Sequence, residues 1–188
     1  MQSNFFAVLM ILRPKDNREE RYVVLTKHPR FGASSTAVIG IPAGTSDDNN
    51  SGDIIGEAVQ MIEDKTGFRV SDGELVDMTA LALEQARIKK HLASARSMSQ
   101  ANGDKQMSLL LWEKDMERTH LEKLKSKFSG QPPRDNLVNV RIRNVDMFWK
   151  EGASDANTLA AWGLYGKLSR DGTLEDRLGR IRAGQGWR

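Results

Sequence analysis

Apolar positions near the start of the chain fall into short runs that polar turns separate. Residues 5–13 (FFAVLMILR) and residues 21–26 (RYVVLT) are rich in strand formers, and the polar segment 14–17 lies between them. A shorter run follows at residues 36–41. The pattern predicts a β-hairpin that is buried on both faces or nearly so, followed by one more strand.

The period of the pattern then changes from strand to helix. After a tight apolar turn at residues 41–44 (IPAG) and a polar loop at residues 45–52, apolar residues recur at helical spacing between residues 53 and 66. They are Ile54, Ile55, Ala58, Val59 and Ile62. Gly67 is well placed to end this helix because glycine adopts a left-handed conformation without strain. The stretch is therefore predicted to be loop, helix, loop.

The second half of the chain contains further candidate strands and helices. Residues 68–70, 75–83, 107–112 and 136–145 have strand character, residues 116–128 form a basic amphipathic segment, and a turn is expected from residue 146. Residues 81–98 are ambiguous between a strand and an amphipathic helix. Residues 155–168 are predicted to form a helix, with Asp155 as its N-cap.

Composition restricts the protein class. The chain of 188 residues is 39% hydrophobic and 28% charged, which is typical of one globular domain. It has no cysteine, so disulfides, thiolate chemistry and cysteine-based zinc sites are excluded. The net charge of +3 and a pI near 9.2 permit contact with a polyanion. There is no apolar run of membrane-spanning length and no basic secretory leader, so an intracellular protein is expected, in the cytoplasm or an organelle matrix.

Residues 40–68 (GIPAGTSDDNNSGDIIGEAVQMIEDKTGF) resemble a Nudix box, the phosphate- and metal-handling loop–helix–loop of the Nudix hydrolases. The chain from about residue 5 to residue 168 resembles the ADP-sugar and ADP-ribose pyrophosphatase branch in the order of its segments. The resemblance implies an α+β fold, an α/β/α sandwich with a mixed β-sheet between helices. It also divides the chain into a Nudix-like domain, residues 1–168, and a basic C-terminal tail, residues 169–188.

The same resemblance assigns the candidate site residues. Substrate binding falls to Arg30, in the segment VVLTKHPRFG, and to Pro42, Ala43 and Gly44 in the turn that opens the box. Metal binding falls to Asp53, Glu57 and Asp64, and the catalytic candidates are Asp64 and Asp104.

The acidic pattern of the family is largely replaced. Gln60 stands at the position of the family's Arg, Met61 at its first Glu, and Asp64 and Lys65 at its adjacent Glu pair, while Gly52 is at an earlier Glu beside Asp53. A second acidic cluster, expected before residues 107–112, reads Gly103-Asp104-Lys105-Gln106. Mg²⁺ needs several hard anionic oxygens, and helical spacing places Met61, Asp64 and Lys65 on neighbouring surface. Loss of metal-dependent hydrolysis is expected.

The tail, residues 169–188, is rich in Gly and Arg and carries Trp187 near its end. It has two interpretations, a disordered terminus or a docking segment, because Arg and Trp are frequent interface anchors. As a docking segment, residues 178–188 would be removable without loss of domain stability.

Three functional hypotheses follow. In the first, the chain is a catalytically degenerate binding or structural subunit of a larger assembly, with protein partners bound through the tail, nucleotide or RNA as possible ligands, and no cofactor. In the second, it is a divergent nucleoside-diphosphate-sugar pyrophosphatase that uses Mg²⁺ or Mn²⁺ and draws its ligands from Asp53, Glu57, Glu63, Asp64 and Asp104. The third, nucleic-acid binding, depends on the tail and on Arg87, Lys89, Lys90 and Arg96.

Overall fold

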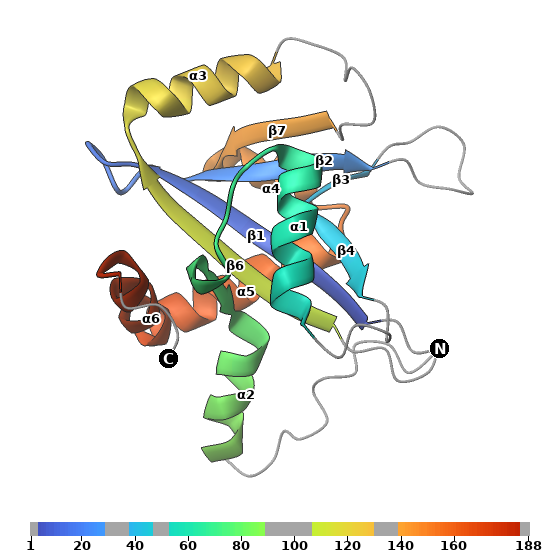
Figure 1. Cartoon of the computed structure of the whole chain (residues 1–188), viewed down its shortest axis with the longest axis vertical. Coiled ribbons are helices and arrows are strands. Elements are labelled where there is room, and N and C mark those ends of the chain that lie inside the picture. Colours follow the sequence, from blue (N-terminus) through green and yellow to red (C-terminus); the bar gives the residue numbers. More distant parts are fainter. Residues whose placement is uncertain (1–3, 29–37, 47–52, 89–106, 130–138, 185–188) are drawn as a thin grey trace.

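The computed structural model describes residues 4–28, 38–46, 53–88, 107–129 and 139–184 (Figure 1). Within these ranges seven strands form one sheet: β1 (Asn4–Pro14), β2 (Tyr22–His28), β3 (Val38–Gly40), β4 (Ala43–Ser46), β5 (Leu75–Asp77), β6 (Met107–Met116) and β7 (Asn139–Asn144). The helices are α1 (Ile54–Thr66), the short 3-10 helix η2 (Asp72–Glu74), α2 (Met78–Ile88), α3 (Arg118–Ser129), α4 (Val145–Gly152), α5 (Ala156–Arg170) and α6 (Thr173–Arg182).

The central strand β1 makes the sheet mixed. It pairs antiparallel with β2 and β4, and parallel with β6 over ten consecutive residue pairs, from Phe5↔Met107 to Pro14↔Met116. β7 pairs antiparallel with β2, and β5 with β6. The N-terminal hairpin predicted from the sequence is confirmed by the antiparallel pair of β1 and β2.

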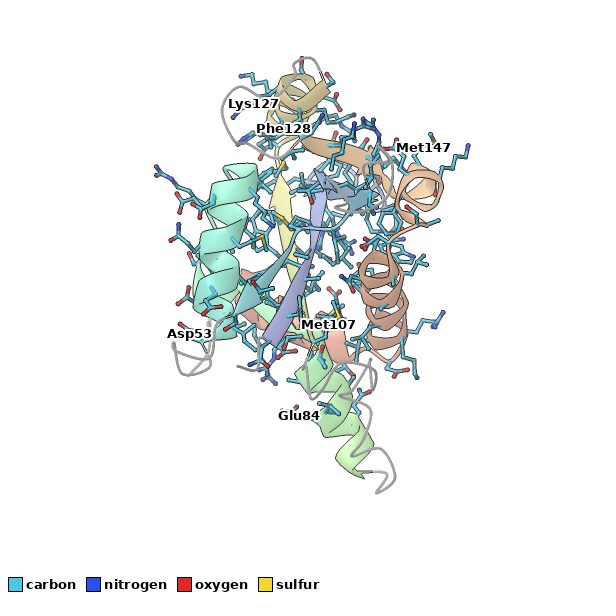
Figure 2. The ribbon with its side chains drawn as sticks, turned by 90° about the vertical axis from the view of Figure 1, so that its right-hand side faces the viewer. Asp53, Glu84, Met107, Lys127, Phe128 and Met147 are labelled. Atoms are coloured by element: carbon cyan, nitrogen blue, oxygen red, sulfur yellow. The ribbon has the colours of Figure 1, made fainter. Side chains whose placement is uncertain are left out.

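The two faces of β1 belong to two hydrophobic clusters. Phe6, Val8, Met10 and Leu12 pack in a cluster with residues of α1 and α3, while Ala7, Leu9 and Ile11 pack in a cluster with residues of α2, α4, α5 and α6. Alternating side chains of a strand point to opposite faces, so a strand that is apolar throughout is buried on both sides. Figure 2 shows the resulting layers, with α1 and α5 on opposite sides of the sheet. The predicted α+β sandwich is confirmed.

The helix of the Nudix-like segment begins and ends where the sequence predicts. Asp53 is the N-cap of α1, and its carboxylate accepts a hydrogen bond from the Gly56 amide. Gly67 ends the helix with φ 73°, and its amide donates to the Glu63 carbonyl. α5 is capped as predicted by Asp155, whose carboxylate accepts from the Thr158 amide at 2.9 Å.

Three sequence-based assignments of secondary structure are wrong. Residues 75–83 are strand only as far as Asp77, because α2 begins at Met78, and residues 68–70 are in no strand. Residue 146 lies in α4 instead of in a turn. The ambiguity at residues 81–98 is resolved as helix up to Ile88, and residues 89–98 lie outside the described ranges. The helix α2 packs against both β6 and α5, and such tertiary contacts override local strand propensity.

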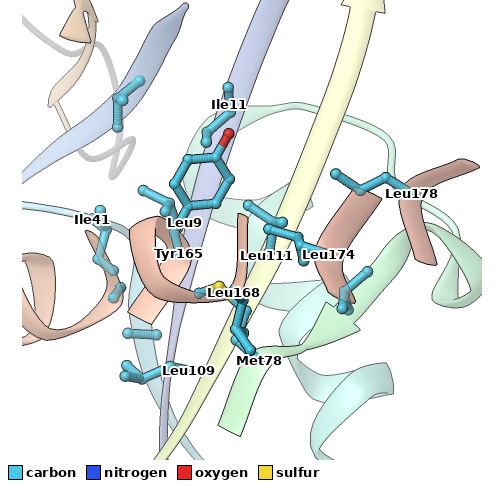
Figure 3. Packing of buried hydrophobic residues seen from close by; sticks show 14 of the residues in the cluster. Leu9, Ile11, Ile41, Met78, Leu109, Leu111, Tyr165, Leu168, Leu174 and Leu178 are labelled. Atoms are coloured by element: carbon cyan, nitrogen blue, oxygen red, sulfur yellow. The ribbon is translucent and has the colours of Figure 1, made fainter. Parts of the chain in front are cut away.

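The boundary expected after residue 168 does not separate a tail from the domain. α5 continues to Arg170, and α6 follows after Gly172, which adopts φ 76°. Leu174 and Leu178 of α6 are 1% and 3% exposed and lie in the same cluster as Leu111 of β6 and Leu168 of α5 (Figure 3). The helix α6 therefore contributes to the hydrophobic core through these two leucines. Trp187 and Arg188 lie outside the described residues.

Candidate functional site

Backbone groups of the turn that leads into the Nudix-like helix anchor this turn to neighbouring elements. The Ile41 amide donates to Thr158 Oγ1 at 2.9 Å, and the Val8 amide donates to the Pro42 carbonyl at 2.8 Å. The next carbonyl, that of Ala43, accepts from Lys65 Nζ at 2.5 Å. Pro42 and Ala43, predicted to bind substrate, therefore use these carbonyl groups in contacts with β1 and α1.

Two glycines of this region are required for close packing. A Cβ atom on Gly44 would lie 2.7 Å from the ring of Phe6, and one on Gly40 would lie 2.6 Å from the carboxylate of Asp155. Real Cβ contacts are longer than this, so a larger residue at either position displaces its neighbour. Gly44, also predicted to bind substrate, has a structural explanation in the Phe6 contact.

The acidic residues assigned to metal binding are engaged in local contacts. Asp53 is exposed, and its Oδ1 accepts from the Gly56 amide at 3.0 Å. Asp64 is exposed, and its Oδ1 accepts from Gln60 Nε2 at 3.0 Å, one helical turn earlier. Glu57 is half-buried in the first turn of α1. Glu63, which the pyrophosphatase hypothesis adds, is exposed and lies 3.8 Å from Arg69 Nε.

The resemblance aligns Met61 with the family's first Glu in the closing part of the box. Its side chain is 9% exposed and packs in the cluster with Phe6, Val8 and Ile62. A thioether in this environment contributes apolar packing and is a poor ligand for a hard cation such as Mg²⁺. The inward face of α1 is therefore apolar where the resemblance places a carboxylate.

Lys65 lies beside this apolar surface. It is half-buried, and burial lowers the pKa of its ammonium group from the ordinary lysine value. Its Nζ is bonded to the Ala43 carbonyl on β4. Lys65 and Asp64 are adjacent in sequence, yet the ammonium is directed to β4 while the carboxylate is exposed and bonded to Gln60.

The divalent metal that the family resemblance implies does not fit these residues. Within the described ranges no three acidic or histidine side chains come together as a possible metal site. A cation near Ala43 would meet the positive charge of Lys65, and Asp53 and Asp64 are each bonded elsewhere. Arg30 and Asp104 lie outside the described residues, so their predicted roles stay predictions.

The structure also contains a buried polar cluster that the sequence did not indicate. The side chain of Glu113, in β6, is 1% exposed. It contacts Arg13 of β1, Tyr165 of α5 and Arg182 of α6. A signal was available, because Glu113 follows the apolar run 109–112 directly and a buried carboxylate requires cationic partners. The four side chains of this cluster come from elements far apart in sequence, so the partners of Glu113 are identified only by the fold.

None of the helices in the described ranges is long and apolar enough to cross a bilayer. No family model matches the chain. Over 171 residues, 91% of this chain, the sequence is 28% identical to Nudix hydrolase 14, chloroplastic, of Arabidopsis thaliana. The chain spans about half of that relative's length, 52%.

Solved structures with a similar fold share little sequence. A chain in the T. brucei MERS1–RNA complex has a TM-score of 0.50 at 8% identity, over 84% of this chain and 56% of that one. RenU, a Nudix hydrolase from M. smegmatis, has a TM-score of 0.46 at 12% identity, over 89% of this chain and 86% of that one. Sequence similarity to a Nudix hydrolase thus extends across nine-tenths of the chain, and the mixed sheet lies between helices as that resemblance implies.

Proposed function

We propose that this chain is a catalytically degenerate Nudix-fold protein that acts as a binding or structural subunit of a larger assembly. The observation that supports this proposal is the ammonium group of Lys65, bonded to the Ala43 carbonyl, at a position where the resemblance implies a carboxylate. The nearby carboxylates of Asp53 and Asp64 cap a helix and accept from Gln60, respectively.

The chemistry explains why these contacts argue against hydrolysis. In metal-assisted cleavage of a diphosphate, the cation stabilises the charge that develops on the phosphoryl oxygens and helps to generate the nucleophile. Mg²⁺ requires near-octahedral oxygen coordination, including anionic ligands. A thioether at Met61, an ammonium at Lys65 and one exposed carboxylate at Asp64 do not supply such a set. The proposed function therefore requires no metal cofactor.

The partner classes proposed here are protein, nucleotide and RNA. Support for RNA as a ligand comes from the fold similarity to a chain in the MERS1–RNA complex, although the sequence identity is only 8%. The helix α3 exposes Lys123 and Lys127, which provide positive charge for contact with a polyanion.

The alternative is a divergent metal-dependent pyrophosphatase for nucleoside-diphosphate sugars. The observation that favours it is the relationship to a protein named as a hydrolase, at 28% identity over 171 residues. It would draw its metal ligands from Asp53, Glu57, Glu63 and Asp64, together with Asp104, which lies outside the described residues.

Hydrolysis assays distinguish the two functions. The full chain is incubated with ADP-ribose or ADP-glucose in the presence of Mg²⁺ or Mn²⁺, and phosphate-containing products are measured. We expect no turnover above background. Turnover that Asp64→Asn abolishes, while the matched exposed variant Asp176→Asn retains it, would establish a metal-dependent enzyme and refute the proposal.

A second measurement addresses the subunit role. The chain isolated from its native source is analysed by native mass spectrometry. The proposal predicts a complex of fixed stoichiometry with protein or RNA. A chain that is recovered alone at concentrations where assemblies persist would contradict it.

A further inference from the structure

We infer that the ammonium group of Lys65 takes the place of a divalent cation at this site, closing the Ala43 carbonyl to metal and connecting α1 to β4 without one. The inference rests on the proposed function, because it identifies the group that stands where a hydrolase would hold its metal. It concerns a property that an activity assay does not measure, namely which cation the site accepts.

The geometry connects three elements. Lys65 lies in the last turn of α1 and donates from Nζ to the Ala43 carbonyl at 2.5 Å. Ala43 begins β4 and pairs with Ala7 of the central strand β1. The ammonium therefore joins the helix to the sheet through one backbone oxygen.

That oxygen is of the kind that hard cations bind. Backbone carbonyls serve as ligands for Ca²⁺ and, together with carboxylates and water, for smaller hard ions. An ammonium is a compact point charge with three donors, so it satisfies a carbonyl in the same place as a cation would. Unlike a metal ion, it is covalently attached and cannot dissociate.

The surroundings of Lys65 favour a monovalent ammonium group over a divalent metal ion. Among the described residues no carboxylate forms an ion pair with Lys65, and the pKa of the ammonium is lowered by burial. Beside it on the inward face of α1 are Met61, Ile62 and Thr66, all buried. A divalent ion would pay a larger desolvation cost here without gaining an anionic ligand.

The Coulomb repulsion between Lys65 and a divalent ion determines how much the binding of that ion is weakened. A divalent ion held about 4 Å from a unit positive charge is disfavoured roughly thirtyfold in binding even at the dielectric constant of water, and more strongly in a half-buried site. This effect raises the dissociation constant of Mg²⁺ or Mn²⁺ at the carbonyl oxygen of Ala43 by the same factor.

The test uses the full chain with Mn²⁺ as the probe. Mn²⁺ broadens the NMR signals of nearby amides, so its position and its affinity can both be measured. In the wild-type chain we expect no preferential broadening of the amide signals of Ala43, Gly44 and Lys65. In Lys65→Glu, which places a carboxylate beside Asp64 and removes the positive charge, we expect preferential broadening of the signals of Ala43 and Gly44. The dissociation constant of Mn²⁺ for Lys65→Glu should be at least about tenfold lower than for the wild type, because removing the repulsion alone accounts for a roughly thirtyfold change.

A second variant covers the case in which Lys65→Glu does not fold. Lys65→Gln removes the charge and keeps an uncharged polar side chain of similar shape at this half-buried position, so the fold should be retained. Mn²⁺ should bind it more tightly than it binds the wild type. Lys150→Gln, on the exposed surface of α4, makes the same change of charge elsewhere and should leave the wild-type behaviour unchanged.

The outcomes separate this inference from the proposed function. Preferential broadening of the Ala43 and Gly44 signals in the wild type would overturn the inference, as would equal Mn²⁺ affinity of the wild type and the folded Lys65 variants. Either result can occur in a chain that hydrolyses nothing. Turnover of a nucleoside-diphosphate sugar by the wild type is the separate result that would refute the proposed function.

Discussion

Arg182 in the last turn of α6 donates from Nη2 to Glu113 Oε1 at 2.6 Å, on a strand 69 residues earlier in the chain. The same carboxylate lies 3.0 Å from Nε of Arg13, and Tyr165 donates to its other oxygen at 3.4 Å. Arg182 also pairs with Glu175, which lies two turns earlier on the same face of α6, at 2.9 Å. A buried carboxylate between two guanidinium groups thus attaches the C-terminal helix to the centre of the sheet.

Neutralising Glu113 should be more damaging than removing one of its partners. Glu113→Gln leaves two partly buried guanidinium groups without their common counter-charge, so the free energy of unfolding should fall by about 3–5 kcal/mol. Arg182→Met leaves the pair of Glu113 with Arg13 intact and should cost about 1–3 kcal/mol. Urea denaturation measures both values, and Arg180→Met, at an exposed position of α6, is the control. A larger loss in Arg182→Met than in Glu113→Gln would contradict this account.

The structure reverses the expectation that residues 178–188 can be removed without loss of stability. Leu178 is 3% exposed in the cluster that contains Leu111 and Tyr165. Leu178→Ala should lower the free energy of unfolding by about 2–5 kcal/mol, and truncation before residue 173 should cost more. The exposed variant Arg180→Ala should stay within about 0.5 kcal/mol of the wild type. An unchanged thermal midpoint after truncation would show that α6 does not hold the core together.

Two glycines should respond to alanine in opposite directions. Gly67 has φ 73° at the end of α1, where a Cβ atom is strained although no neighbour is within 4 Å. Gly67→Ala should destabilise the chain by about 1 kcal/mol. Gly163 is exposed within α5 and has no such φ, so Gly163→Ala should stabilise it by about 0.5–1 kcal/mol. Thermal unfolding of the two variants side by side is the measurement, and the same sign for both would refute the conformational argument.

The depressed pKa of Lys65 predicts a pH dependence of stability. The unfolded chain holds the lysine proton up to about pH 10.4, whereas the folded chain releases it at lower pH. Between the pKa of Lys65 in the folded chain and its pKa in the unfolded chain, the unfolded state binds more protons. The free energy of unfolding therefore rises with pH in this range. The free energy of unfolding of the wild type relative to Lys65→Gln should therefore be more favourable near pH 10 than near pH 7, because the desolvation cost is present only in the charged form. The same comparison for the exposed Lys123→Gln should show no such rise, and a difference for Lys65→Gln that falls with pH would contradict the effect of burial.

Secondary-structure elements with a strong hydrophobic periodicity could be predicted directly from the sequence. The apolar run at residues 5–13 predicts a strand buried on both faces, and the spacing from residue 53 to residue 66 predicts α1, because these patterns follow from the geometry of strand and helix alone. The caps at Asp53, Gly67 and Asp155 are also local, since a cap interacts with backbone groups a few residues away. The resemblance to the Nudix box, which places Met61 and Lys65 at acidic positions of the family, also comes from the sequence alone.

Interactions between distant segments were decided only by the tertiary structure. Residues 75–83 have strand character, but α2 packs against β6 and α5 and takes most of them into a helix. The tail is polar and basic on average, yet two leucines at positions 174 and 178 place α6 in the core. The contact of Lys65 with Ala43 depends on the pairing of β4 with β1, which fixes the distance between α1 and the sheet. Sequence determines which groups are available at each position, whereas packing of the sheet and helices determines which of them meet, because burial is a property of the whole fold.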